Sequence, residues 1–321
     1  MPVKANFLLF SPRTLALALL IFFLGTSDET FAECAVSAKV EEIQPGLFVR
    51  HGKYGAVFEQ SNLANVGFIV GDSCIAVIDS GGSPDEGEAL RCAIRDVSPL
   101  PICYVINTHV HPDHTLGNQA FEQEQPEFVG HSKIARAFLL LGDTYIERAR
   151  IASPNDTRQS GLHVVKPGTL IENTVELELG NRPLRIQPVS QSHTDNDLTV
   201  LDIKTGTLWT GDLVFAEHVP VIGGSGSING WIDSLDRIAD DGVKRIVPGH
   251  GPVSGMWRDV IDLQRQYLLL LRSELRDWIV DGGDIGPAVE KLVQSERDKW
   301  QMFDHFHKRN VSYAYTELEW E

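Results

Sequence analysis

The sequence predicts a mixed α/β domain followed by a helical C-terminal extension. Two halves of the chain each contain short apolar segments separated by turns rich in Gly and Asn, which is the pattern of β-strands. A clear helix start lies in the first half, and a long amphipathic segment follows the last predicted strand. The composition agrees with a folded domain, since 42% of the 321 residues are hydrophobic and 22% are charged.

Residues 1–32 have the layout of a secretory signal peptide. Lys4 and Arg13 precede an apolar run at 14–24, and Thr30-Phe31-Ala32 supplies the small residues of a cleavage site after Ala32. An uncleaved membrane anchor is the alternative, but the apolar run is too short to span a bilayer stably. We therefore predict a periplasmic or secreted protein with no stable membrane anchor.

The first half of the domain contains the clearest helix start. In Ser83-Pro84-Asp85-Glu86, Ser stands at the N-cap, Pro at the first helical position and Glu three residues after the cap, which predicts a helix through Asp96. Residues 102–107 (ICYVIN) form a continuous apolar run, typical of a strand covered on both faces. We predict further strands at 40–43, 47–51, 66–70, 74–79 and 127–129, and further helices at 115–122 and 133–141.

The second half repeats this alternation and ends in helices. We predict strands at 175–179, 184–189, 198–203, 207–209 and 245–247, and a helix at 232–240. A long amphipathic helix at 256–280 runs to the Gly282-Gly283 stop, and another helix is expected at 287–299. Residues 33–255 are thus predicted to form one domain, on which a helical extension, 256–321, packs.

The charge balance restricts the partners. The chain has 28 Lys and Arg residues against 44 Asp and Glu residues, a net charge of −16, and no basic block offsets it. Because phosphate binding relies on clustered Lys and Arg, we expect no nucleic-acid partner. The substrate that we expect is a small molecule.

The four cysteines, Cys34, Cys74, Cys92 and Cys103, lie in the first third of the chain. No C-x-x-C pair is present, so a thiolate zinc site is not expected. In an oxidising compartment these cysteines can form disulfides, whose pairing the sequence does not give, while buried inert thiols are the alternative. Both interpretations stay open.

One segment carries an abnormal density of metal-binding residue types. Residues 108–114 (THVHPDH) place three imidazoles and one carboxylate within six residues, directly after the apolar strand at 102–107. The strand end and the Pro turn direct His109 and His111 toward one point, while Asp113 and His114, at a helix start, face a second point nearby. A single catalytic zinc takes three protein ligands, so four candidates indicate two metal ions.

Three more candidates follow apolar strands in the second half: His193, Asp212 and His250. Residues at strand ends converge on one rim of a sheet, where functional groups are often carried. Glycines beside Asp212 and His250 permit a close approach of the backbone. Each motif alone is more often an ordinary turn, but together with the H-x-H-x-D-H cluster they indicate one site.

The other six histidines are weaker candidates. We interpret His51, His131 and His163 as packing or surface residues, and His305 and His307 as parts of a polar tail. His218 lies shortly after Asp212 and is a candidate to line a substrate pocket.

The H-x-H-x-D-H signature, with His193, Asp212, His250 and an early Asp79 in VIDSG, resembles the metallo-β-lactamase superfamily over roughly residues 40–255. The segments NTHVHPDHTLGN, SHTDNDLTV, GTLWTGDLVF and VPGHGP, with the secretory start, are most similar to the quinoprotein relay-system zinc metallohydrolases, exported proteins associated with quinoprotein dehydrogenases. This resemblance implies a four-layer αββα sandwich with a dinuclear metal site at one sheet edge.

The resemblance also implies a role for each residue of the signature. Asp79 would stiffen the metal-bearing loops without binding metal. Asp113 would be the catalytic residue, orienting the attacking water and passing a proton to the leaving group. Of two Zn²⁺ ions, the first would be bound by His109, His111 and His193, the second by Asp113, His114 and His250, and Asp212 would bridge them.

Three functions remain in competition. The first is an exported dinuclear zinc hydrolase that uses a metal-bridging hydroxide on an ester, thioester or amide and is linked to a quinoprotein dehydrogenase system. The second is an iron-dependent oxidoreductase of the same fold, since His and Asp also suit iron. The third is a non-catalytic accessory protein. A penicillinase is disfavoured, because the secreted lactamases that most resemble the His193 segment carry a Cys in the second zinc site, where this chain has Asp212 and adds His114.

Overall fold

The computed structural model describes residues 1, 34, 36–53, 63–152, 161–238 and 242–321. Cys34–Glu321 forms one compact unit. The signal peptide predicted at 1–32 lies, apart from Met1, outside the described residues and stays a prediction. Among the helices of the described ranges, none has the length and apolar character needed to span a bilayer.

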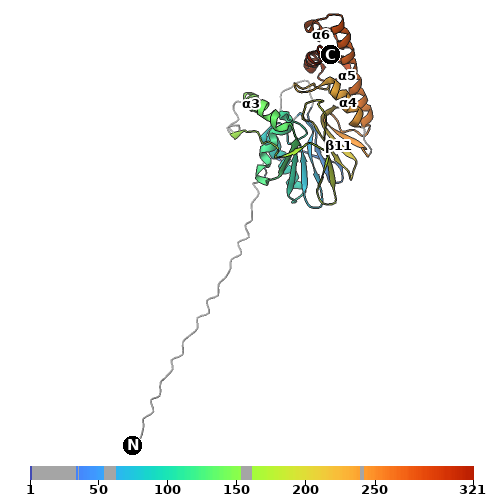
Figure 1. Ribbon diagram of the computed structural model, residues 1–321. Coiled ribbons are helices and arrows are strands. Elements are labelled where there is room, and N and C mark those ends of the chain that lie inside the picture. The colour runs from blue at the N-terminus through green and yellow to red at the C-terminus, as the bar shows by residue number, and fades with distance from the viewer. Residues whose placement is uncertain (2–33, 35, 54–62, 153–160, 239–241) are drawn as a thin grey trace. The chain divides into compact units, whose positions relative to one another are not determined.

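The first half of the chain builds a mixed sheet (Figure 1). Its first four strands pair antiparallel in chain order, and the later ones pair parallel. Within the described ranges the sheet runs, in order, through β1 (Glu41–Gln44), β2 (Leu47–Arg50), β3 (Val66–Val70), β4 (Ile75–Ile78), β5 (Ile102–Ile106), β6 (Glu127–His131) and β7 (Thr169–Ile171).

The second half builds another sheet. Its described strands are β8 (Val175–Glu178), β9 (Pro183–Pro188), β10 (Leu198–Asp202), β11 (Thr207–Phe215) and β12 (Arg245–His250), arranged in the order β12-β11-β10-β9-β8. β11 and β12 run parallel, and the other neighbours run antiparallel.

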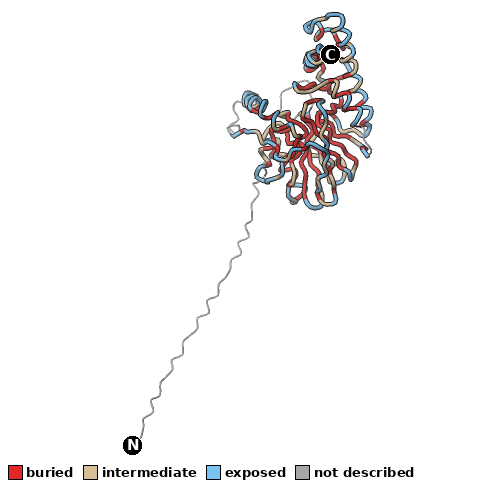
Figure 2. The backbone as a smooth tube through the Cα atoms, in the orientation of Figure 1, coloured by how far each residue is buried: buried red, intermediate tan, exposed pale blue. Residues whose placement is uncertain are grey.

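Alternation along the strands explains why the two sheets stack face to face. In β4, Val77 points to the outer face of its sheet, while the next residue, Ile78, joins the cluster between the sheets. Val200 and Trp209 enter the same inner cluster from the second sheet. Figure 2 shows that the buried residues concentrate along these strands.

Helices cover both outer faces and complete the αββα sandwich, which confirms the predicted fold class. α1 (Pro84–Val97) and the 3-10 helix η1 (Leu116–Glu124) pack on the first sheet. α4 (Ile228–Ile238), α5 (Trp257–Val280) and α7 (Phe303–Leu318) share an apolar cluster with the second sheet. The remaining helices are α2 (Pro112–Thr115), α3 (Ile134–Ala152), α6 (Ile285–Lys291) and the 3-10 helix η3 (Gln294–Lys299).

Local structure matches the prediction at the first helix and differs at two later ones. Ser83 caps α1, because its hydroxyl accepts the Glu86 N–H. Residues 115–122 form mainly the 3-10 helix η1 instead of an α-helix, and they include Gly117 and Asn118, which are weak α-helix formers. The helix expected at 287–299 is split into α6 and η3, since Val293 between them has a φ of 54°.

The polar tail predicted around His305 and His307 is wrong. The segment is the helix α7, whose apolar residues recur at helical spacing and are buried. His307 is buried too, with its Nδ1 3.0 Å from the Tyr267 hydroxyl and its Nε2 2.9 Å from the Leu292 carbonyl. The extension therefore contributes to the core.

Two disulfides account for the four cysteines. Cys34 is bonded to Cys92, and Cys74 is bonded to Cys103. The alternative of inert thiols is therefore wrong. The first bridge fastens the start of the folded unit to α1, and the second joins the approach to β4 to the neighbouring β5. Such links restrict the unfolded chain and so stabilise the fold.

Candidate metal centre

The residues of the predicted metal site come from separate segments and gather at neighbouring strand ends. One ligand atom from each member of two groups, His109, His111, His193 and Asp212, and Asp113, His114 and His250, lies within 4.8 Å of the others in its group. His109 and His111 follow β5, Asp113 and His114 belong to α2, His193 follows β9, Asp212 lies in β11, and His250 ends β12.

Asp212 was predicted to follow its strand, but β11 continues through it. The pairing of β11 with β12 shifts register on both sides of Gly211, where φ is 49°. A Cβ at Gly211 would lie 2.5 Å from Thr108 Oγ1, and a Cβ at Gly249 would lie 2.0 Å from Asp212 Oδ1. Gly211 therefore permits close contact with Thr108, and Gly249 lets β12 approach Asp212, whose carboxylate lies beside the histidines.

The first group surrounds one point. His111 Nδ1 lies 3.0 Å from His109 Nε2 and 2.9 Å from His193 Nε2. Asp212 Oδ2 lies 3.3 Å from His193 Nε2 and 3.7 Å from His109 Nε2. Donor atoms bound tetrahedrally to zinc are about 3.3 Å apart, so this spacing fits one ion.

The histidines of the second group, His114 and His250, face the other oxygen of the Asp212 carboxylate. Asp212 Oδ1 lies 3.1 Å from His114 Nε2 and 3.3 Å from His250 Nε2. Asp113 Oδ2 lies 3.3 Å from His250 Nε2 and 3.7 Å from His114 Nε2. Asp212 is thus shared by both groups.

Hydrogen bonds behind the first group fix where its lone pairs point. His193 Nδ1 donates to the Val221 carbonyl at 2.6 Å, and burial lowers the pKa of His193 to about 3, so Nε2 carries a lone pair at neutral pH. The Thr108 hydroxyl donates to Asp79 and accepts from His109 Nδ1, which leaves a lone pair on His109 Nε2 as well. Lone pairs that converge on a carboxylate fit a bound cation.

The electrostatics of the second group also favour positive charge. Burial alone would lower the pKa of His114, but the carboxylates of Asp212, Asp79 and Asp113 raise it well above its usual value. In the same way Asp212 and Asp113 outweigh burial and raise the pKa of His250 to about 9. Among the described residues, His114 Nε2 and Asp212 Oδ1 are buried atoms without a hydrogen bond. A place that favours a proton this strongly also suits a metal cation.

Asp79 supports both groups from behind. Its Oδ1 accepts the Thr108 N–H at 2.8 Å, and its Oδ2 accepts the Thr108 hydroxyl and His114 Nδ1, each at 2.7 Å. The contact with His114 turns the Nε2 of that ring toward Asp212. This geometry matches the supporting role expected for Asp79.

A cavity of about 330 Å³ adjoins the two groups. His218, a candidate pocket residue in the sequence, contributes to its wall, with its ring stacked on Phe215 and its Nδ1 donating to the Val219 carbonyl at 2.6 Å. Burial lowers the pKa of His218 to about 4, so the ring is neutral. The lining also includes apolar side chains and three cations. The apolar residues are Leu63, Phe215, Val221, Met302 and Phe306, and the cations are Lys53, Arg148 and Arg309.

The sequence prediction missed the cavity residues that come from helices. Tyr145 and Arg148 are three residues apart and share one face of α3. Phe306 and Arg309 share one face of α7 in the same way. The buried apolar spacing of α7 was a usable signal for that helix, but nothing in the local sequence showed that it faces the histidines.

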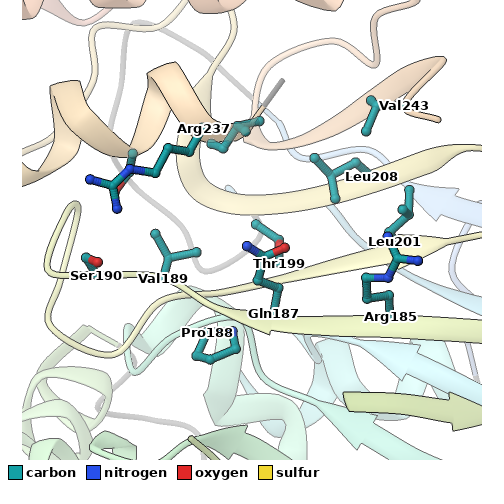
Figure 3. A pocket seen from close by; sticks show the side chains of 12 residues that line it. Arg185, Gln187, Pro188, Val189, Ser190, Thr199, Leu201, Leu208, Arg237 and Val243 are labelled. Atoms are coloured by element: carbon teal, nitrogen blue, oxygen red, sulfur yellow. The ribbon is translucent and has the colours of Figure 1, made fainter. Parts of the chain in front are cut away.

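A second hollow, of about 100 Å³, lies between α4 and the second sheet (Figure 3). Arg185, Thr199 and Arg237 are among its lining residues. None of the residues that line this hollow, in the ranges described, is a His, Cys, Asp or Glu. The side chains with metal-binding chemistry therefore adjoin the larger cavity.

Comparison with known proteins places this signature in a family. A model of the metallo-beta-lactamase superfamily matches residues 62–250. A linear primary-alkylsulfatase from Pseudomonas sp. is 25% identical over 255 residues, which cover 68% of this chain and 48% of the relative. The acyl-coenzyme A thioesterase MBLAC2 of Gallus gallus is 27% identical over 220 residues, covering 63% of this chain and 77% of the relative. The chain thus spans about half the length of the alkylsulfatase.

Solved structures share the fold. The sec-alkylsulfatase Pisa1 from Pseudomonas sp. aligns with a TM-score of 0.67 at 17% identity, over 87% of this chain and 50% of its own. A metallo-beta-lactamase from Pontibacter korlensis aligns with a TM-score of 0.56 at 18% identity, over 72% of this chain and 98% of its own. From the αββα sandwich, the His and Asp signature and the match over residues 62–250, we conclude that the chain belongs to the metallo-beta-lactamase superfamily.

Proposed function

We propose that the chain is an exported dinuclear zinc hydrolase that acts on an ester, thioester or amide. The observation that carries the proposal is the position of Asp212, whose two oxygens face two separate sets of imidazoles at 3.1–3.7 Å. Two zinc ions would share Asp212, and one would be held by His109, His111 and His193 and the other by Asp113, His114 and His250.

Zinc bound at these residues would supply a water molecule that ionises near neutral pH and a positive charge beside the developing oxyanion. Asp113 reaches the cavity, since its side chain is 21% exposed. Burial alone would raise the pKa of Asp113, but His114 and His250 lower it to about 2, so it is ionised at neutral pH. Its carboxylate can therefore accept a hydrogen bond from the attacking water, take up its proton and pass it to the leaving group.

The names of two relatives support this class of reaction. One is an alkylsulfatase and the other an acyl-coenzyme A thioesterase, so each is named for the hydrolysis of an ester-type bond. The apolar walls of the cavity suit the acyl or alkyl part of such a substrate.

Hydrolysis by the zinc-loaded protein, measured on a panel of aryl esters, acyl thioesters, sulfate esters, amides and lactams, tests the proposal. We expect turnover of at least one class, and a loss of about 100-fold or more in kcat/KM for His111→Ala and for Asp113→Ala with folding retained. His163→Ala is the matched control, because His163 is exposed, pairs with Glu122 and does not line the cavity. Full turnover by either site variant would refute the residue roles, and inactivity across the panel would favour an accessory protein.

Metal identity separates hydrolysis from the redox alternative, because imidazole and carboxylate ligands bind iron as well as zinc. We expect elemental analysis of protein purified without added metal to give two zinc ions per chain. Iron in their place, with oxygen consumed during turnover, would establish the iron-dependent oxidoreductase instead.

Export is supported by the two disulfides, since such bonds persist in oxidising compartments. Cell fractionation with sequencing of the mature N-terminus tests it. We expect a periplasmic or secreted protein that begins at Glu33, and a cytoplasmic full-length chain would contradict this. The proposed link to a quinoprotein dehydrogenase is tested by co-purification from the native host, where the absence of any such enzyme would count against it.

A further inference from the structure

The lining of the cavity beside the candidate metal centre includes three cationic side chains that the metal ligands do not explain. Lys53, Arg148 and Arg309 all line it and all are exposed. Within the described part of the chain, none of the three forms an ion pair with a carboxylate. The Arg309 guanidinium does lie 5.4 Å from the centre of the Tyr313 ring.

The chain has 44 acidic residues against 28 basic ones, so carboxylates that could pair with an arginine are plentiful. Several other arginines are held by carboxylates, as in the buried pair of Arg182 with Asp202 and the exposed pair of Arg276 with Glu321, whereas Arg148 and Arg309 are not, among the residues that the structure describes. The cations at the cavity therefore remain available to a ligand. In a chain of net charge −16, they also form a local attraction for an anion.

Two of the three cations share a helix face with an aromatic residue of the lining. On α7, Phe306 and Arg309 both line the cavity, and on α3 the partners are Tyr145 and Arg148. Both arginines line the same cavity as His111, Asp113 and His193. A molecule that enters the cavity thus meets apolar surface, guanidinium groups and the candidate metal ligands together.

We propose that Arg148 and Arg309, assisted by Lys53, bind an anionic group of the substrate that is joined by an apolar segment to the bond that is hydrolysed. The substrate class is an amphiphilic ester or thioester with a terminal carboxylate, sulfate or phosphate. That this substrate is hydrolysed rests on the proposed function, whereas the anion subsite rests on the residues of the cavity alone.

Binding measured by calorimetry on the zinc-loaded protein tests the subsite without turnover. The probes are hexanoate and adipate. They have the same number of carbon atoms, but hexanoate ends in a methyl group and adipate ends in a second carboxylate. We expect one carboxylate of each probe to bind at the zinc ions, so that the difference in Kd reports on the distal anion. We expect adipate to bind about tenfold more tightly, and each single substitution, Arg148→Gln or Arg309→Gln, to reduce this preference about threefold.

The double variant carrying R148Q and R309Q should bind the two probes equally. Arg150→Gln is the matched control, because Arg150 lies on α3 with the same charge but does not line the cavity. Equal binding of hexanoate and adipate by the unchanged protein, across dicarboxylates of shorter and longer chains, would overturn the subsite. So would an adipate preference that survives in the double variant. Hexanoates with a terminal sulfate or phosphate then show which anion binds best.

Hydrolysis of the matched para-nitrophenyl esters separates the two proposals. If the hexanoate ester is cleaved and the adipate monoester shows no advantage that depends on the arginines, the hydrolase stands and the subsite fails. If adipate binds through the arginines and neither ester nor any other class in the panel is cleaved, the subsite stands and the hydrolase fails.

Discussion

Replacement of Asp79 by Asn tests whether hydrogen bonds behind the site control the metal ligands. Asp79 has a φ of 53°, and Asn tolerates this left-handed conformation as well as Asp does, so the backbone should keep its course. The change is nearly isosteric and removes one charge and one acceptor. Its effect is therefore confined to the contacts of the side chain.

The carboxylate of Asp79 accepts three donors: the Thr108 N–H at one oxygen, and the Thr108 hydroxyl and His114 Nδ1 at the other. An amide offers one oxygen, so whichever way it turns, its NH₂ group meets either the Thr108 N–H or His114 Nδ1–H. In the second case His114 loses the bond that turns Nε2 toward Asp212. A buried hydrogen bond to a charged group is worth about 2 kcal/mol, which corresponds to about 30-fold in zinc affinity.

Competition with a zinc chelator measures this loss, and we expect it at the ion bound by Asp113, His114 and His250. Asp202→Asn is the control, because Asp202 is a buried carboxylate that accepts from Arg182 away from the site. It should lower the free energy of unfolding while leaving zinc affinity unchanged. Unchanged zinc affinity in Asp79→Asn would show that these hydrogen bonds do not orient a metal ligand.

Two further changes act on the same site. Gly249→Ala places a methyl group 2.0 Å from Asp212 Oδ1. We expect this substitution to displace the shared carboxylate, release zinc and lower the free energy of unfolding by about 1–3 kcal/mol. The control Gly255→Ala, with nothing within 4 Å of its Cβ, should keep both ions. In metal-free protein the pKa of His250 is raised to about 9 from 6.5, so its charge stabilises the fold fully below about pH 6.5 and this contribution is lost as the pH rises through about 9. Urea denaturation of the metal-free protein between these pH values should show the free energy of unfolding decline, and His250→Gln should reduce this decline. The same pH dependence in both proteins would show that His250 does not cause it.

The fold and the histidine cluster could be predicted because their signals are local. The Ser83 cap, the apolar strand at 102–107 and the H-x-H-x-D-H run each specify structure within a few residues. The end of β11 could not be predicted in this way, since Gly211 and Asp212 are residue types that are common in turns. Pairing with β12 overrides that local preference and carries the strand to Phe215.

Features that depend on contacts between residues far apart in the chain could not be predicted from the sequence. The disulfide pairing follows from which strands and helices become neighbours, as between Cys74 and Cys103 on adjacent strand segments. Arg148 has the same local chemistry as Arg150, yet Arg148 alone of these two lines the cavity. Only the packing of α3 and α7 around the site distinguishes them.

The most direct measurement of the central claim is anomalous diffraction at the zinc absorption edge from crystals of the mature protein. We predict two zinc peaks about 3.5–4 Å apart, one on each side of the Asp212 carboxylate, the first contacted by His109, His111 and His193 and the second by Asp113, His114 and His250. A single peak, a peak at the iron edge instead, or no peak beside Asp212 would contradict the dinuclear zinc site.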